Sequence, residues 1–176
     1  HGVMPIASSN IWRYNQYTDL KAVFAPDVSH IYMAVVAGLA EVGFSGIAIT
    51  PEFGARNRFI TLLTSADIAP DPLIPPGTVC DRCMLCRKHC PTAALSTEID
   101  GDKLLKIEGC EYRFANKNLW RCAWGEHFNL DTDLEIPEQV TEQGIVDAIE
   151  KHGQRSGEMG QCVKFCLPAH RRSREQ

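Results

Sequence analysis

Four cysteines stand close together in the spacing C-x2-C-x2-C-x3-C, and a proline follows the last of them. A loop with three thiolates at intervals of three residues can surround one iron-sulfur cubane, with its backbone N–H groups facing the sulfides. The fourth cysteine then begins a helix and points away from that cubane. The four residues are Cys80, Cys83, Cys86 and Cys90.

Four further cysteines, Cys110, Cys122, Cys162 and Cys166, are spread over the rest of the chain. Eight thiols make two complete sets of four, and in two-cluster ferredoxins the last cysteine of such a run binds the other cluster. We therefore predict two 4Fe–4S clusters that transfer single electrons. The first set would be Cys80, Cys83, Cys86 and Cys166, and the second Cys90, Cys110, Cys122 and Cys162.

Other interpretations of these residues remain open. Zinc also binds C-x2-C pairs, but it would leave the third close cysteine and Cys90-Pro91 unexplained. Disulfides between residues three apart would be strained, and any single later cysteine could be a small buried hydrophobe. His89 lies beside the run, as a ligand or as a neighbour of the ligands. The aromatic set around Cys122 could shield a cluster or pack a core; it comprises Trp120, Trp124, His127 and Phe128.

The elements that must position these cysteines fall into three predicted parts. Residues 1–65 include a helix that is capped by Ser29, has helical apolar spacing from His30 to Leu39 and should end near Gly43. Short strands at 47–49 and 58–64 follow. Residues 66–79 contain four prolines and form a linker. Residues 80–176 form the cysteine-bearing domain, with a hairpin turning at Asp100-Gly101 and helices near 111–124, 138–151 and 158–166. Pro137 would lie in the first turn of the middle helix.

Composition limits the function classes. The chain has 176 residues, 44% of them hydrophobic, and a formal net charge of -4, which argues against a broad DNA-binding surface. No apolar run approaches the ~20 residues that cross a bilayer, and no secretory signal is evident. Clusters of this kind need reduced thiols, so we expect a reducing cytoplasm. The chain begins with His1, which suggests a piece of a longer protein.

The chain resembles the family of epoxyqueuosine reductases and corrinoid reductive dehalogenases, chiefly its electron-transfer half. The resemblance runs from about Asp27 to Pro168. It rests on the order and intervals of several short segments taken together. These are A-G-L-A-E-V-G at 37–43, I-T-P-E-F-G at 49–54, L-L-T at 62–64, Pro70-Asp71 and the cysteine run.

The resemblance implies an α+β fold, in which part of a nitroreductase-like α+β domain precedes a two-cluster ferredoxin-like module with extra helices. It also implies a cobalamin cofactor beside the nearer cluster and an external donor of the flavodoxin or ferredoxin type. Asp27, Ser29 and His30 would lie near the corrin or substrate. Gly38, Gly43 and Gly46 either allow close approach of a cofactor or merely form turns and packing contacts. No catalytic residue is assigned.

Two departures from the family pattern stand out. Little of the chain precedes the matched region, where the family places much of its corrinoid domain. The second family motif, C-x2-C-x3-C-P, has Met159 at its first position, and Pro168 is displaced by Leu167. Three hypotheses follow: the electron-delivery part of a corrinoid-dependent reductase, a stand-alone carrier of electrons, or a structural or regulatory iron-sulfur protein.

Overall fold

The computed structural model describes residues 1–6, 28–96, 101–153, 155 and 160–172. Its strands form three separate antiparallel pairs. The pairs are β1 (Val3–Pro5) with β4 (Leu62–Thr64), β2 (Glu41–Val42) with β3 (Ala48–Ile49), and β5 (Asp102–Ile107) with β6 (Cys110–Ala115). Asp27 lies outside the described residues.

The helices are short, apart from one near the C-terminus. They are α2 (His30–Val36), α3 (Leu85–Lys88), α4 (Leu119–Cys122), α5 (Glu142–His152) and α6 (Gln161–Phe165). The π-helical turn η2 (Ala123–His127) continues α4, and the 3-10 turns are η3 (Leu130–Thr132) and η4 (Ala169–Arg171). None of the helices in the described part of the chain has the length and apolar character needed to span a bilayer.

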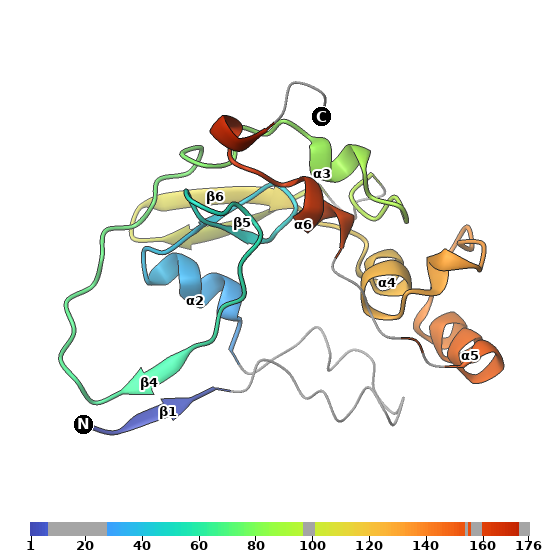
Figure 1. Ribbon diagram of the computed structural model, residues 1–176, viewed down its shortest axis with the longest axis horizontal. Helices are drawn as coiled ribbons and strands as arrows, with labels where there is room; N and C mark the ends of the chain where they lie inside the picture. Colours follow the sequence, from blue (N-terminus) through green and yellow to red (C-terminus); the bar gives the residue numbers. More distant parts are fainter. Residues whose placement is uncertain (7–27, 97–100, 154, 156–159, 173–176) are drawn as a thin grey trace.

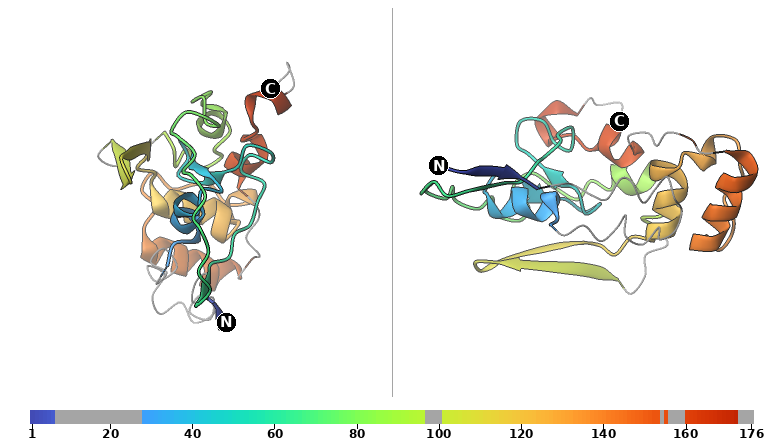
Figure 2. Two further views of the ribbon diagram at one scale, coloured as in Figure 1. Left: turned by 90° about the vertical axis from the view of Figure 1, so that its left-hand side faces the viewer. Right: turned by 90° about the horizontal axis from the view of Figure 1, so that it is seen from below.

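The elements are arranged along one long axis. The β1–β4 pair lies at one end, and α4 and α5 lie at the other (Figure 1). Seen from below, the β5–β6 hairpin runs beneath α2 along much of that axis (Figure 2). Helix α6 lies between these regions and packs against α3. The C-terminal segment is thereby brought beside the cysteine run.

The N-terminal helix begins as predicted, because the Ser29 side chain accepts a hydrogen bond from the Tyr32 N–H at 3.4 Å. It ends at Val36, well before the predicted end near Gly43. Gly38 adopts a left-handed conformation with φ +71°, and its N–H donates to the carbonyl of Val35. A glycine in this conformation is a common helix stop, so the chain turns before Leu39.

The hairpin that the structure describes turns at a later position than the predicted Asp100-Gly101, and Asp100 itself lies outside the described residues. Residues from Asp102 to Ile107 form one continuous strand, and the turn lies at Glu108-Gly109. Both of these residues have positive φ, 44° and 84°, as a two-residue type I′ turn requires. The returning strand takes about the first third of the region predicted as a helix at 111–124, since it ends at Ala115.

The two later helices exist, with shifted starts. Helix α5 begins after Thr141, whose hydroxyl accepts a hydrogen bond from the Gly144 N–H at 3.1 Å. Pro137 therefore precedes the helix and is not in its first turn. The proline-rich residues 66–79 contain neither helix nor strand, as their composition predicts.

The segments before and after this linker share a hydrophobic core. Val35 and Val42 from the first segment are buried against Tyr112 and Phe114 of β6. The Tyr112 hydroxyl donates a hydrogen bond to the carbonyl of Ile74, 2.8 Å away, which fastens the linker to the same core. The described residues on either side of the linker are therefore packed together. The nitroreductase-like and ferredoxin-like fold assignments stay predictions.

Candidate metal centres

The cysteine run forms a tight loop that leads into α3. Arg82 and Met84 both have positive φ, 54° and 61°, which is uncommon for residues other than glycine. Such conformations cost about 1–3 kcal/mol each and persist where surrounding contacts hold them, often at functional sites. The two left-handed residues curl the backbone so that the three thiols face one side of the loop.

A pocket lies between this loop and the segment that follows α6. Its walls include the three thiols of the loop and the Cys166 thiol, together with Phe44. The structure thus brings together the four cysteines predicted as the first set, and we call this space the first pocket. These residues are Cys80, Cys83, Cys86 and Cys166.

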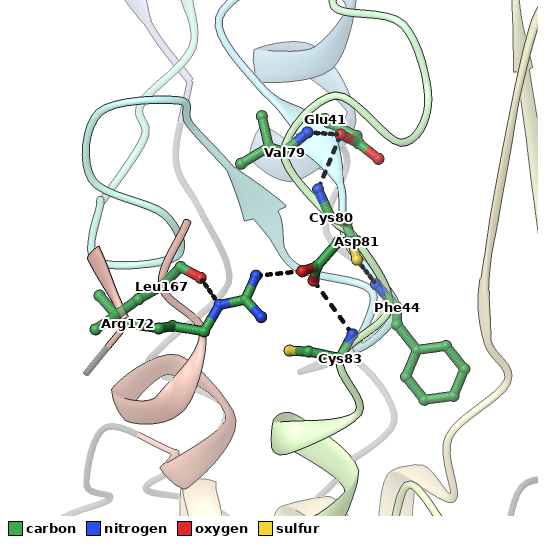
Figure 3. A network of polar contacts seen from close by, with 8 residues as sticks. All are labelled: Glu41, Phe44, Val79, Cys80, Asp81, Cys83, Leu167 and Arg172. Atoms are coloured by element: carbon green, nitrogen blue, oxygen red, sulfur yellow. Dashed lines mark hydrogen bonds and ion pairs between the residues drawn. The ribbon is translucent and has the colours of Figure 1, made fainter. Parts of the chain in front are cut away.

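A buried carboxylate holds the start of the loop in place. Glu41 is only 3% exposed, and it accepts hydrogen bonds from three backbone N–H groups. Figure 3 shows the bonds from Val79 and Cys80. The donors are Gly77 and Val79, each at 2.7 Å, and Cys80 at 3.2 Å. Phe44 donates its own N–H to the Cys80 sulfur at 3.3 Å. An N–H bond to a ligand sulfur stabilises negative charge on it and tunes a cluster's potential.

An ion pair closes the first pocket from the C-terminal side. The Arg172 guanidinium lies 2.6 Å from Asp81 and also donates to the Leu167 carbonyl at 3.0 Å (Figure 3). The other oxygen of Asp81 accepts the Cys83 N–H at 3.2 Å. Partial burial pushes the pKa of Asp81 upward, but the hydrogen bond and charge of Arg172 hold it below its usual value.

The predicted T-P-E-F-G segment supports Cys166. Gly54 has φ +63°, and a Cβ there would lie 2.6 Å from the Cys166 carbonyl oxygen. The next residue, Ala55, donates its N–H to that same oxygen at 3.3 Å. Only glycine permits this close approach of the two backbones. The segment therefore helps to position a thiol of the first pocket.

A second pocket contains three cysteines from separate elements. Cys90 follows α3, Cys122 ends α4, and Cys162 lies in α6. The carboxylates of Glu126 and Asp131 also line it. The Arg121 side chain donates to the Thr92 carbonyl at 2.7 Å and so ties α4 to the segment after Cys90.

Cys110 does not line either of these pockets. It opens β6, pairs with Ile107 across the hairpin and packs beside the buried Tyr112. The structure therefore brings together three of the four cysteines predicted as the second set. The reason is local: residues 110–115 form a strand, whereas the prediction placed most of them in a helix.

Burial keeps several of these thiols protonated in the metal-free chain. It raises the pKa of Cys86 to about 11 and that of Cys162 and Cys166 to about 12. Burial would lower the pKa of Lys117, but negative charge on Cys122 and Cys162 in their thiolate forms raises it, so the Lys117 cation and thiolates at the second pocket stabilise one another. A bound metal needs thiolates, so loading would displace these protons.

The arrangement of the candidate ligands can be compared with what a single metal ion and an iron-sulfur cluster each require. Within the described residues, no three Cys, His, Asp or Glu side chains converge on the position of a single metal ion. A zinc ion would hold every sulfur about 2.3 Å from one centre, whereas a cubane spreads its thiolates over separate irons. The first pocket is lined by four cysteines, and the backbone N–H of Phe44 is directed at the sulfur of one of them, Cys80.

The remaining predicted residues lie elsewhere. His30 bonds Thr61 through Nδ1 at 2.7 Å, and it lines a third cavity together with Asn57 and Arg58. Ser29 caps α2. The space beside the three predicted glycines is taken by protein, as their packing interpretation expects. A Cβ would meet Pro72 at Gly38, Ile49 at Gly43 and Phe114 at Gly46.

The residues beside the cysteines also have defined surroundings. His89 stacks on Phe165 with ring centroids 3.7 Å apart. Trp124 and Phe128 are buried against residues of α5, which is the packing role left open above. Glu126 was not singled out by the sequence. The position of Glu126 four residues after Cys122 is the one signal that would have found it.

Comparisons with known proteins point to one group of enzymes. The chain is 39% identical over 94 residues to a tetrachloroethene reductive dehalogenase of Desulfitobacterium hafniense, which is 52% of this chain and 16% of that protein. It is 42% identical over 81 residues to the tetrachloroethene reductive dehalogenase of Dehalobacter restrictus, which is 45% of this chain and 14% of that protein. It is 35% identical over 68 residues to the tetrachloroethene reductive dehalogenase of Sulfurospirillum multivorans, which is 38% of this chain and 14% of that protein.

These matches support the dehalogenase side of the predicted resemblance and an oxidoreductase context. The chain spans about one sixth or less of the length of these curated relatives. Neither a protein-family model nor a solved structure matches it.

Proposed function

We propose that this chain is an iron-sulfur electron-transfer module that carries two 4Fe–4S clusters. It would form the electron-delivery part of an oxidoreductase similar to the reductive dehalogenases. One observation supports this most directly: α6 and its C-cap supply Cys162 to one cysteine-lined pocket and Cys166 to the other. One short helix therefore connects two sets of thiols, which is the arrangement that electron transfer between two clusters needs.

The roles of the residues follow from their surroundings. The loop thiols and Cys166 would hold the first cluster, and Cys90, Cys122 and Cys162 would bind the second. When bound, the clusters supply reversible one-electron transfer. The protein contributes burial, the N–H donor of Phe44 and the nearby cations Arg172 and Lys117, all of which influence a cluster's potential.

The proposal also includes an electron donor and an electron acceptor. The external electron donor would be a flavodoxin or ferredoxin, and the electron acceptor would be a corrinoid such as cobalamin. The similarity to named dehalogenases supports this acceptor. The epoxyqueuosine reductase relationship remains a prediction. Assembly of the clusters would require reduced thiols and hence a reducing compartment.

The experiment is an anaerobic count of iron, sulfide and cobalt in the purified chain, followed by addition of cobalamin. About eight iron atoms with matching sulfide are expected. Cobalt retention, or tight binding of added cobalamin, would place the chain in a corrinoid reductase. Eight iron atoms without cobalamin binding would leave a stand-alone carrier. A chain that binds zinc instead of iron would refute the proposal.

The structural or regulatory alternative has its own measurement. Clusters that only hold a fold together need not be reducible at accessible potentials. An anaerobic potential titration followed by EPR should show reversible one-electron reduction of the loaded chain. If neither cluster can be reduced, the electron-transfer proposal fails and the structural alternative replaces it.

A further inference from the structure

The second pocket has fewer thiols than a 4Fe–4S cluster has irons. Among the described residues it is lined by Cys90, Cys122 and Cys162, while Cys110 sits in the β5–β6 hairpin. A cubane held by three thiolates has one iron that needs a different ligand. The pocket also contains two carboxylates, so the question is which of them reaches that iron.

Glu126 lies on the same helical face as a ligand of this pocket. It follows Cys122 by four residues along the continuous run of α4 and η2, and side chains with this spacing lie one above the other. The π-helical turn η2 contains Glu126. Turns of this type interrupt helices mainly at functional sites. The sequence thus delivers a thiol and a carboxylate from neighbouring turns to one space.

Gly160 shows how close Glu126 is to a second ligand. A Cβ built at Gly160 would lie 3.2 Å from the Cys162 sulfur and also 3.2 Å from Cγ of Glu126. The two side chains are therefore neighbours across a position that has no side chain of its own.

Asp131 is the weaker candidate of the two carboxylates. One of its oxygens lies 3.3 Å from the Cβ position of Gly125, a position that is 2.9 Å from the Thr92 methyl group. The Asp131 carboxylate thus lies on the Thr92 side of the pocket, whereas the Glu126 side chain lies beside the Cys162 sulfur. His127 Nε2 lies 3.0 Å from Oε2 of Glu126, an arrangement that still permits monodentate binding through Oε1.

We propose that Glu126 supplies the fourth ligand of the second cluster, so that one iron is held by a carboxylate and three by thiolates. This inference rests on the proposed function. Carboxylate oxygen is a harder donor than thiolate and suits iron-sulfur chemistry less well. The Glu126-bound iron should therefore be the first to leave on oxidation, and the first cluster, with four thiolates, should keep its iron.

The test uses the full chain reconstituted anaerobically with iron and sulfide. Ferricyanide removes one electron from the [4Fe–4S]²⁺ cluster and becomes ferrocyanide; the resulting 3+ cluster releases Fe²⁺ and leaves [3Fe–4S]⁺. The released iron is trapped by a coloured chelator, and the [3Fe–4S]⁺ product is counted by EPR. The parent chain should release about one ferrous ion per chain, and all from the second cluster.

Three variants decide the assignment. Glu126→Cys should slow the release roughly tenfold, because a thiolate replaces the carboxylate. Glu126→Gln, of the same shape, should release the iron faster than the parent. Cys110→Ala should behave as the parent does. Circular dichroism checks the folding of each variant, and Glu126→Asp, which keeps the carboxylate, should retain an oxygen-bound iron if another variant fails to fold.

Each contrary outcome has a separate meaning. Equal release from the parent and both Glu126→Cys and Glu126→Gln would overturn the assignment. Loss of the second cluster in Cys110→Ala would make Cys110 the fourth ligand, and faster release in Met159→Ala alone would assign that thioether instead. Failure of the parent chain to bind iron and sulfide at all would refute the proposed function itself.

Discussion

The two cysteine pockets are built in different ways. The first takes three of its four thiols from one short loop, which Glu41 holds by accepting three backbone N–H bonds. The second takes its thiols from three separate elements and has a carboxylate among them. A contiguous motif therefore describes the first pocket almost completely, whereas the second depends on how distant segments pack. The predictions below test this difference, from the largest expected effect to the smallest.

Cys162 and Cys166 are four residues apart, yet they line different pockets. Cys162→Ala should abolish the second cluster alone, and Cys166→Ala should impair the first alone. Each change should reduce the iron content from about eight to about four atoms per chain, measured by iron and sulfide analysis with EPR of the reduced protein.

Cys110→Ala is the matched control, with both clusters retained, because Cys110 lines neither pocket. If Cys162→Ala and Cys166→Ala deplete the same cluster, the division into two pockets is incorrect.

Glu41 should matter for the stability of the first pocket. Glu41→Ala would leave three partly buried N–H groups without their acceptor and should lower the free energy of unfolding by about 2–4 kcal/mol. Denaturant unfolding of the loaded chain under anaerobic conditions measures this loss. Glu111→Ala is a suitable control because its carboxylate is 44% exposed. An equal loss in both variants would contradict the role of Glu41.

Gly54 and Gly77 form a second matched pair. Both have positive φ, so alanine at either position costs about 1–2 kcal/mol in backbone strain. Only at Gly54 would the added Cβ meet a neighbour, the Cys166 carbonyl oxygen at 2.6 Å. Gly54→Ala should therefore also perturb the EPR spectrum of the first cluster, whereas Gly77→Ala should change stability only. Identical spectra in the two variants would exclude a positioning role for Gly54.

Arg172 should have the smallest effect. Its partner Asp81 is 48% exposed at the side chain, so loss of the pair costs less than about 1 kcal/mol. Arg172→Gln removes a positive charge near the first cluster and should lower its midpoint potential by up to about 40 mV. Arg172→Lys keeps the charge and should shift the potential less. A shift confined to the second cluster would reverse the assignment.

The sequence predicted the first pocket well because its motif acts locally. Three of its thiols lie within one loop, so they can be predicted to lie together without knowing the rest of the fold. Cys110 was misplaced because the surrounding segment was expected to be helical. The alternation of Glu111, Tyr112, Arg113 and Phe114 is the strand signal that was available.

The spacing of Glu126 from Cys122 is a local signal, but its neighbour Cys162 comes from a distant part of the chain, so the spacing alone does not place Glu126 beside that second thiol. The same limit applies to the shared core: Val35 and Tyr112 meet only once the hairpin has folded back on α2. Packing of one element against another depends on the tertiary structure. The sequence pattern shows which positions are apolar but not which elements they contact.

The position of α6 has a consequence for the biogenesis of the protein. The ribosome releases the chain from its N-terminus, so the loop at residues 80–90 emerges well before Cys162 and Cys166. Neither pocket has its full set of thiols until that late segment has been made. Iron and sulfide delivered to a shorter nascent chain would meet incomplete sites, which favours insertion only after α6 has been made and can close both pockets in one step.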